Sequence, residues 1–213
     1  MAKLRELLSV APVLPVITID DAARAVDLAK ALAAGGIGIA EITLRTPAGL
    51  PSIELIAARV PNFVVAAGTV LTPADLDSAA RAGARFAVSP GSTRELLEAA
   101  ASNQALPFLP AVATPSELMQ AAGFGHDCFK LFPAAALGGV AALDALGGPF
   151  PDARFCPTGG IGESSAADYL ARPNVLCVGG SWLAPRAAIA RGDWAAITES
   201  ARKAAALPRP SKR

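Results

Sequence analysis

Lys130 is the residue whose position most clearly indicates chemistry. It lies inside the apolar run Cys128–Phe132, whereas the other four lysines lie near the termini or in a helical pattern. Side chains alternate along a strand, so Lys130 faces the interior if Phe129 and Leu131 face outward. A buried lysine must lose its charge or find a partner, and a neutral amine in a dry pocket attacks carbonyl groups. The alternative is a structural lysine that is paired with a carboxylate.

A second isolated charge, Glu41, interrupts the apolar run Ile39–Leu44. A carboxylate that faces the interior could act as a general acid and base, moving protons to and from a substrate hydroxyl. The alternative is a simple ion pair with Arg45 or Lys130. Two isolated charges buried in one fold favour a functional site more than either charge does alone.

Two glycine-rich turns follow apolar runs near the end of the chain, Thr158-Gly159-Gly160 and Gly179-Gly180-Ser181. Glycines let backbone N–H groups approach phosphate oxygens closely, and Ser181 adds a hydroxyl donor. These turns are therefore candidates for a phosphate site, and plain tight turns are the alternative. Arg45 and Thr69 could bind a carboxylate through the two-pronged guanidinium, unless Arg45 is an ordinary surface arginine.

These residues require elements that bring them together, and short apolar runs bounded by Gly or Pro predict buried parallel strands. The runs lie at Val13–Ile17, Ile39–Leu44, Phe63–Ala67, Phe86–Ser89, Pro107–Pro110, Cys128–Phe132, Arg154–Pro157 and Val175–Val178. Helical patterns separate the runs, and each begins with a residue that favours a helix start. The start signals are Asp20 or Asp21 before Ala22–Ala34, Thr72-Pro73, Thr93, Thr114-Pro115, Ser164 or Ser165, and Gly192-Asp193.

Eight strands alternating with helices predict an α/β fold, a single (β/α)8 TIM barrel with an N-terminal helix, spanning residues 1–213 as one domain. The alternative, a doubly wound open sheet, favours a Gly-rich fingerprint after the first strand. The segment there, Thr18-Ile19-Asp20-Asp21, has no glycine. In a barrel the site lies at the C-terminal ends of the strands, and phosphate often binds after strands seven and eight, where the Gly-Gly turns fall.

The composition argues against several classes of partner. Charged residues make up 17% of the chain and the net charge is +1, which gives no reason to expect nucleic acid or an anionic membrane as a partner. The N-terminus has no pattern of a signal peptide, so we expect a cytoplasmic protein. The apolar runs are too short to span a membrane.

Cysteine and histidine offer little for metal chemistry. The three cysteines, Cys128, Cys156 and Cys177, lie in apolar strand-like runs and are expected to be buried reduced thiols. The single histidine, His126, precedes the sixth expected strand, so we expect it at the opposite, N-terminal rim as a structural residue. The two tryptophans, Trp182 and Trp194, are expected to be packing groups.

Taken in order, these segments resemble the 2-keto-3-deoxy-6-phosphogluconate (KDPG) and 4-hydroxy-2-oxoglutarate aldolase family. The resemblance runs from about Pro12 to about Trp194. The matching segments are Ala40-Glu41-Ile42-Thr43-Leu44-Arg45-Thr46, Ala67-Gly68-Thr69-Val70-Leu71, Ala87-Val88-Ser89-Pro90-Gly91, Phe129-Lys130-Leu131-Phe132-Pro133-Ala134, Arg154-Phe155-Cys156-Pro157-Thr158-Gly159-Gly160-Ile161 and Val178-Gly179-Gly180-Ser181-Trp182-Leu183.

The resemblance implies a class I aldolase that cleaves KDPG, a phosphorylated 2-keto acid, to pyruvate and glyceraldehyde 3-phosphate. It implies Lys130 as the Schiff-base lysine and Glu41 as the general acid and base. The remaining implied roles are the carboxylate site at Arg45 and Thr69, pocket walls at Pro90, Phe132 and Thr158, and the phosphate site at Gly159, Gly160, Gly179, Gly180 and Ser181. The family needs no metal or other cofactor and is usually a homotrimer.

One departure from the family is Ala135, where many members carry Glu, and it lies on the loop after the sixth strand. The alternatives within the enzyme class are a preference for 4-hydroxy-2-oxoglutarate or for 2-keto-3-deoxy-6-phosphogalactonate. Outside it stand a metal-dependent pyruvate aldolase, a non-covalent phosphosugar-binding or isomerase barrel, and an inactive structural barrel. The last of these would not explain why two charges interrupt apolar strands.

Overall fold

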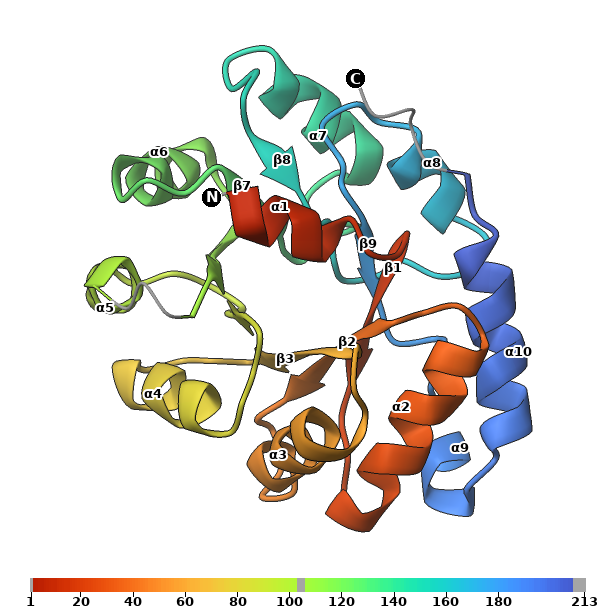
Figure 1. Cartoon of the computed structure of the whole chain (residues 1–213). Helices are drawn as coiled ribbons and strands as arrows, with labels where there is room; N and C mark the ends of the chain where they lie inside the picture. Colours follow the sequence, from red (N-terminus) through yellow and green to blue (C-terminus); the bar gives the residue numbers. More distant parts are fainter. Residues whose placement is uncertain (1, 103–105, 209–213) are drawn as a thin grey trace.

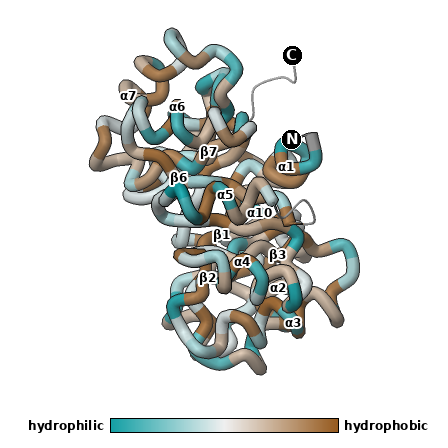
Figure 2. Tube along the Cα trace, turned by 90° about the vertical axis from the view of Figure 1, so that its left-hand side faces the viewer, coloured by the Kyte–Doolittle hydropathy of each residue, from teal (hydrophilic) through white to brown (hydrophobic). Residues whose placement is uncertain are grey.

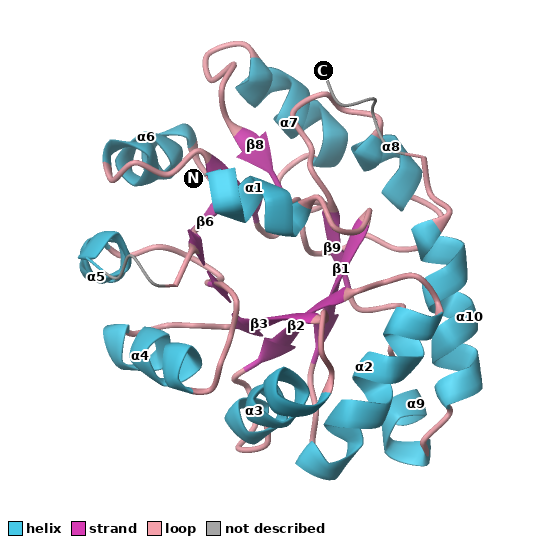
Figure 3. Ribbon diagram, viewed as in Figure 1, coloured by secondary structure: helices cyan, strands magenta, loops and turns pink. Residues whose placement is uncertain are grey.

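The structure is a computed structural model that describes residues 2–102 and 106–208. The chain opens with helix α1 and then alternates strands and helices around a ring, with the strands inside and most helices outside (Figures 1 and 3). The strands are β1 (Val13–Ile17), β2 (Ile39–Thr43), β3 (Val64–Gly68), β4 (Ala87–Val88), β5 (Phe108–Leu109), β6 (Ala111–Val112), β7 (Cys128–Leu131), β8 (Arg154–Phe155) and β9 (Val178–Gly180).

Within the described residues, nine strand segments fill eight positions of the ring because Pro110 divides the fifth one. Proline has no N–H to donate, so β5 pairs with β4 on one side and β6 pairs with β7 on the other. The Pro110 carbonyl still accepts a hydrogen bond from the Lys130 N–H at 2.9 Å. The predicted strand Pro107–Pro110 is therefore correct in place but too short, since it continues to Val112.

The ring closes through parallel pairs throughout. β1 lies between β2 and β9, with Val13 opposite Val178. The gap between β8 and β9 is closed by two backbone hydrogen bonds, from Leu176 N to Phe155 O at 2.9 Å and from Gly179 N to Pro157 O at 2.8 Å. This closure confirms the predicted (β/α)8 barrel, and the doubly wound open sheet is wrong.

The helices are α1 (Ala2–Leu8), η1 (Ala22–Arg24, a 3-10 turn), α2 (Ala25–Ala34), α3 (Gly49–Arg59), α4 (Pro73–Arg81), α5 (Arg94–Ser102), α6 (Pro115–Gly123), α7 (Gly139–Gly147), α8 (Ala166–Leu170), α9 (Arg186–Arg191) and α10 (Trp194–Ala205). The predicted start signals are confirmed in α4 and α6, where Thr72 and Thr114 each form a full capping box with the acidic residue three positions later. In Figure 2 the helices alternate between hydrophilic and hydrophobic residues, as expected of helices with one face on the ring.

Helix α1 covers the N-terminal end of the barrel (Figure 1). Its leucines Leu4, Leu7 and Leu8 are buried, and Arg5 pairs with Asp127, which directly precedes β7. His126 lies at the same end, as predicted, with its ring edge-on to Phe108 at a centroid distance of 5.8 Å. With one end covered in this way, the other end of the barrel is left for a site.

The predicted state of the cysteines is also confirmed: Cys128, Cys156 and Cys177 are buried and form no disulfide. Over residues 2–102 and 106–208, no helix is long and apolar enough to cross a membrane. In the same part of the chain, no three His, Cys, Asp or Glu side chains gather in a group that could bind a metal ion.

Candidate active site

A cavity of about 520 Å³ opens at the C-terminal ends of the strands. Lys130 lines the cavity from β7, and Phe132 lines it from the position directly after β7. Arg45 lines it from the loop after β2. The turn after β8, residues 158–161, and the end of β9 with its following loop, residues 179–182 and 184–186, form much of the wall. The cavity therefore gathers the polar strand ends that the sequence analysis selected.

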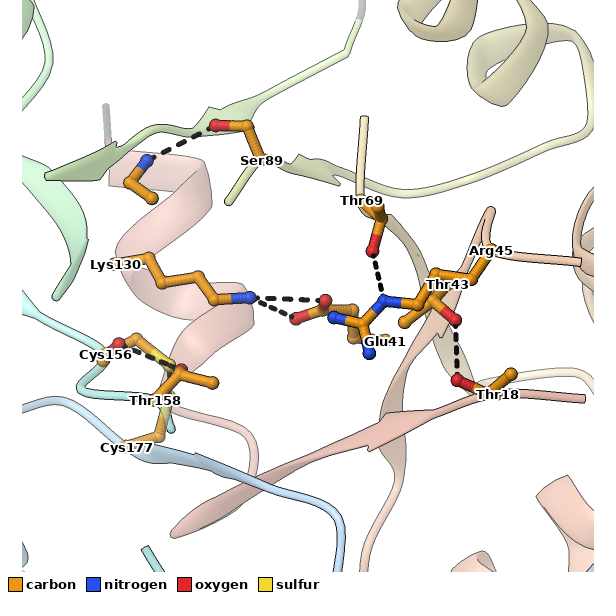
Figure 4. Close-up of polar contacts among 11 residues, drawn as sticks. Thr18, Glu41, Thr43, Arg45, Thr69, Ser89, Lys130, Cys156, Thr158 and Cys177 are labelled. Atoms are coloured by element: carbon orange, nitrogen blue, oxygen red, sulfur yellow. Dashed lines mark hydrogen bonds and ion pairs between the residues drawn. The ribbon is translucent and has the colours of Figure 1, made fainter. Parts of the chain in front are cut away.

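Lys130 and Glu41 face each other across the interior of the barrel (Figure 4). The Lys130 Nζ lies 3.3 Å from Glu41 Oε1 and 3.4 Å from Oε2. Lys130 is 4% exposed and Glu41 is 1% exposed, so the two charges lie in a largely dry environment. Because Lys130 also lines the cavity, its amine lies where a ligand in the cavity can reach it.

The space for the Glu41 carboxyl comes from a missing side chain. Gly68, at the end of the neighbouring strand β3, lies beside Glu41, and a Cβ at Gly68 would lie 2.2 Å from Glu41 Oε1 and 2.4 Å from its Cγ. Opposite the carboxyl, the Lys130 Nζ lies 5.5 Å from the centroid of the Phe132 ring, within the range of a cation–π contact. Gly68 and Lys130 therefore lie on either side of the carboxyl, and Phe132 contacts the lysine.

Arg45 and Thr69 lie together, as the sequence analysis expected. The Arg45 Nε donates a hydrogen bond to Thr69 Oγ1 at 3.1 Å (Figure 4). Thr69 adopts a left-handed backbone with φ of 60°, which is rare for a β-branched residue and marks a position where the surrounding fold imposes the conformation. The guanidinium is exposed at the cavity wall, with donors left over for an anion.

The two glycine-rich turns lie side by side in the wall of the cavity. Gly159 and Gly160 have φ values of 99° and 74°, a backbone that L residues rarely adopt. A Cβ at Gly179 would lie 2.1 Å from the Thr158 Oγ1, so the glycine allows β9 to pack on the turn after β8. Ala135 packs against this wall, because a Cβ at Gly160 would lie 2.5 Å from the Ala135 Cβ.

Three predicted residues do not line the cavity directly. Glu41 lies behind Lys130, Thr69 lies behind Arg45, and Pro90 lies half-buried at the end of β4 outside the cavity lining. Conversely, Thr18 and Arg186 line the cavity although neither was predicted from the sequence. Thr18 directly follows β1, so the strand-end rule could have found it, whereas Arg186 belongs to the later helix α9.

The two tryptophans differ in their relation to the cavity. Trp182 packs on the core, as predicted, but it also lines the cavity. A Cβ at Gly180 would lie 1.7 Å from the Trp182 ring, so that glycine makes room for the indole. Trp194 packs on the core without lining the cavity.

Ionisation is perturbed at the covered end of the barrel and at the rim of the cavity. Burial raises the pKa of the Cys128 thiol to about 12, which keeps it protonated and unreactive. Burial lowers the pKa of His126, although the Asp127 carboxylate opposes the shift. At the rim, a hydrogen bond from Arg186 lowers the pKa of Asp20.

Comparisons with known proteins agree with this geometry. The family model described as KDPG and KHG aldolase matches residues 4–200. A 2-dehydro-3-deoxy-phosphogluconate aldolase of Pseudomonas aeruginosa is 51% identical, over 95% of this chain and 92% of that protein. A KHG/KDPG aldolase of Escherichia coli is 50% identical, over 93% of this chain and 92% of that protein.

A solved structure is similar throughout the fold. The crystal structure of a KDPG aldolase from Legionella pneumophila has a TM-score of 0.92 and 46% sequence identity, and the match covers 95% of this chain and 98% of that one. That protein holds pyruvate captured at low pH as a covalent carbinolamine intermediate. A carbinolamine is the first adduct of an amine with a ketone, the chemistry expected of a lysine in such a cavity.

Proposed function

The chain belongs to the KDPG and KHG aldolase family, and we propose that Lys130 and Glu41 carry its reaction. The activity is the class I cleavage of 2-keto-3-deoxy-6-phosphogluconate to pyruvate and glyceraldehyde 3-phosphate. The observation that carries the assignment is the buried contact of 3.3 Å between Lys130 Nζ and Glu41 Oε1 beside the cavity.

In the first half of the reaction, the Lys130 amine attacks the C2 ketone of the substrate and forms a carbinolamine. Loss of water, with a proton supplied by Glu41, gives the protonated imine. The imine withdraws electrons from C3, so the C3–C4 bond breaks when Glu41 takes the proton of the C4 hydroxyl. Glyceraldehyde 3-phosphate leaves, and the electrons of the broken bond form an enamine on the pyruvate half.

In the second half, Glu41 returns the proton to C3 of the enamine, and water adds to the resulting imine. Collapse of the carbinolamine releases pyruvate and restores the Lys130 amine. Burial favours this chemistry because a carboxylate and an amine in a dry site exchange protons with each other and with the substrate instead of with bulk water. Glu41→Gln should therefore lower kcat by about 100-fold or more.

The substrate lies, in this proposal, with its carboxylate on Arg45 and its phosphate on the glycine-rich turns. Arg45 is a cation with a two-pronged donor edge, and Thr69 fixes its orientation. Gly159, Gly160 and Gly180 offer backbone N–H groups and Ser181 offers a hydroxyl to the phosphate. The Gly179 N–H already donates to Pro157 O, so Gly179 contributes by letting β9 pack closely on Thr158. Phe132 and Thr158 form the wall between the two anion sites, with Pro90 supporting the neighbouring strand end.

Borohydride trapping tests the mechanism. The protein is incubated with pyruvate and borohydride, and the modified peptide is located by mass spectrometry. We expect a reduced pyruvyl adduct on Lys130, lost in Lys130→Ala and retained in Lys30→Ala, which removes an exposed lysine on α2. An unmodified Lys130 in folded protein would exclude the covalent mechanism and favour a non-covalent phosphosugar barrel.

Cleavage of 4-hydroxy-2-oxoglutarate is a second candidate activity, because the Escherichia coli relative carries both names. The same amine and carboxylate serve both substrates, since the reacting carbons are the same. Steady-state assays with each substrate would compare the two values of kcat/KM.

We propose further that residues 1–213 act as one domain, in the cytoplasm, as a homotrimer. The family resemblance supports this assembly. Light scattering coupled to size-exclusion chromatography should then give three times the 21.5 kDa mass of the chain. A mass of one chain at micromolar concentration would contradict the trimer.

A further inference from the structure

A cation that the proposed mechanism does not use lines the same cavity. Arg186, the first residue of α9, shares the cavity wall with Gly160, Ser181 and Lys130. Its side chain is 63% exposed and forms an ion pair with Asp20, in the loop after β1. In Figure 1 the short helix α9 lies beside the N-terminal end of α2, so this pair joins the loops that follow the last and first strands.

The ion pair uses only one edge of the guanidinium. The Nε donates to Asp20 Oδ2 and the Nη2 donates to Asp20 Oδ1. A guanidinium carries five N–H donors, so this side-on contact leaves the two hydrogens on Nη1 and one on Nη2. One hydrogen of Nη1 and the remaining hydrogen of Nη2 point the same way and form the end-on fork, which suits a second oxyanion. The contact lowers the pKa of Asp20 and raises the pKa of Arg186, so both groups stay charged at neutral pH.

The charges around the cavity leave one end of the substrate without a cation. A phosphorylated 2-keto acid has a carboxylate at C1 and a phosphate dianion at C6. Arg45 serves the carboxylate, and Lys130, beside Glu41, is the amine that reacts with the C2 ketone. The glycine-rich turns and Ser181 contribute neutral donors only. An arginine adds to such donors a full positive charge and a two-pronged geometry that matches a phosphate.

We propose that Arg186 binds the substrate phosphate through its free fork and is a specificity-determining residue for phosphorylated over dicarboxylate substrates. Asp20 is a positioning residue, which holds the guanidinium by its other edge. This inference rests on the proposed function. A phosphate on C6 reaches further along the cavity than the C5 carboxylate of 4-hydroxy-2-oxoglutarate, and it carries more charge, so Arg186 acts mainly on the longer substrate.

Two substitutions on one helix test the role of Arg186. Arg186→Gln removes the charge and the fork, and Arg191→Gln removes an exposed arginine at the other end of α9, outside the cavity lining. We expect Arg186→Gln to raise KM for KDPG about tenfold, with kcat and the KM for 4-hydroxy-2-oxoglutarate within about twofold of the parent. Arg191→Gln should leave all of these values near the parent. Equal changes in KM for both substrates, or no change for KDPG, would overturn the proposal.

Asp20→Asn tests the positioning role. We expect it to raise KM for KDPG about threefold in the parent protein and to have no effect in the Arg186→Gln background, because it acts through the guanidinium. An equal effect in both backgrounds, or none in either, would remove Asp20 from the proposal.

Borohydride trapping with pyruvate distinguishes a failure of the proposed function from a failure of the Arg186 proposal, because pyruvate has no phosphate. A parent protein that traps pyruvate on Lys130 but shows no selectivity change in Arg186→Gln refutes only this inference, whereas no trapping refutes the proposed function.

Discussion

At the scale of single residues, the site depends as much on an absent side chain as on those present. Gly68 leaves the space that the Glu41 carboxyl fills. The close contacts of a Cβ there would be with both the carboxyl and the Cγ of Glu41, so rotation of the carboxyl alone would not relieve them. The glutamate would have to move away from Lys130.

Gly68→Ala should therefore lower kcat by about 100-fold while the barrel remains folded, because it displaces Glu41, the proposed general acid and base. Steady-state kinetics and circular dichroism of the purified variant would measure the two properties. Gly123→Ala at the end of α6 is the matched control, since a Cβ there meets nothing within 4 Å. A kcat for Gly68→Ala equal to that of the control would show that Glu41 tolerates displacement.

His126 predicts a dependence of stability on pH. Its pKa in the folded protein is lowered by burial, so the unfolded chain, with a pKa near 6.5, binds more protons between the two values. Above about pH 6.5 the imidazole is neutral in both states and costs no stability. Below that pH the free energy of unfolding decreases, because the unfolded chain takes up the proton more readily. Urea unfolding at pH 7.5 and pH 5.5 should show this loss in the parent protein and a smaller loss in His126→Gln.

Because His126 is the only histidine, no other imidazole contributes to that difference. Identical pH dependence in the parent and in His126→Gln would mean that the ring is protonated equally well in both states. The same substitution should leave kcat unchanged, since His126 lies at the end of the barrel opposite the cavity.

Residue patterns could predict Lys130 and Glu41 because a charge within an apolar strand is visible in the sequence itself. Their mutual distance could not be predicted, since it depends on the packing of β2 against β7 across the interior. Arg186 was missed for a related reason. Nothing in its local sequence indicates that the loop after β9 folds back to the cavity.

At the scale of elements, helices α4 and α6 begin in the same way. The Thr72 and Thr114 hydroxyls accept hydrogen bonds from the N–H groups of Asp75 and Glu117, and those acidic side chains accept from the threonine N–H groups. Thr114→Ala should lower the free energy of unfolding by about 1 kcal/mol. Urea denaturation would measure it, with Ser116→Ala, an exposed position in the same turn, as a control near zero.

The helices that the sequence analysis did not identify share one property. The residues that precede α3, α7 and α9 are Ala48, Gly138 and Pro185, none of which forms a side-chain cap. Start signals are residue types that can cap a helix, so helices preceded by other types were missed. The signal does not require the bond itself, because Ser165 precedes α8 without making a cap hydrogen bond. The split of the fifth strand at Pro110 was missed because proline usually ends a strand.

At the scale of the whole molecule, α10 ties the end of the chain to α2. Gly35 ends α2, and a Cβ there would lie 2.5 Å from both Ala201 Cβ and Thr198 O of α10. Thr198 also donates a hydrogen bond to the Ala31 carbonyl at 3.0 Å. Because backbone atoms cannot give way as a flexible side chain does, this contact requires glycine.

Gly35→Ala should lower the free energy of unfolding by about 2 kcal/mol, as expected of overpacking against backbone. Hydrogen exchange would then become faster in β1 and β9 together, since these strands pair with each other and close the ring. Faster exchange confined to α10 would instead indicate that this helix opens independently of the barrel.

The closed ring has a consequence for when the protein can work. Glu41 comes from β2 and Lys130 from β7, and the wall that faces them comes from β9. A chain still emerging from the ribosome can hold the carboxylate, the lysine and most of the strands, yet it lacks a complete pocket until β9 pairs with β1. We therefore expect activity to appear only when the last strand joins the ring, so that the reaction rate reports the concentration of fully folded chains.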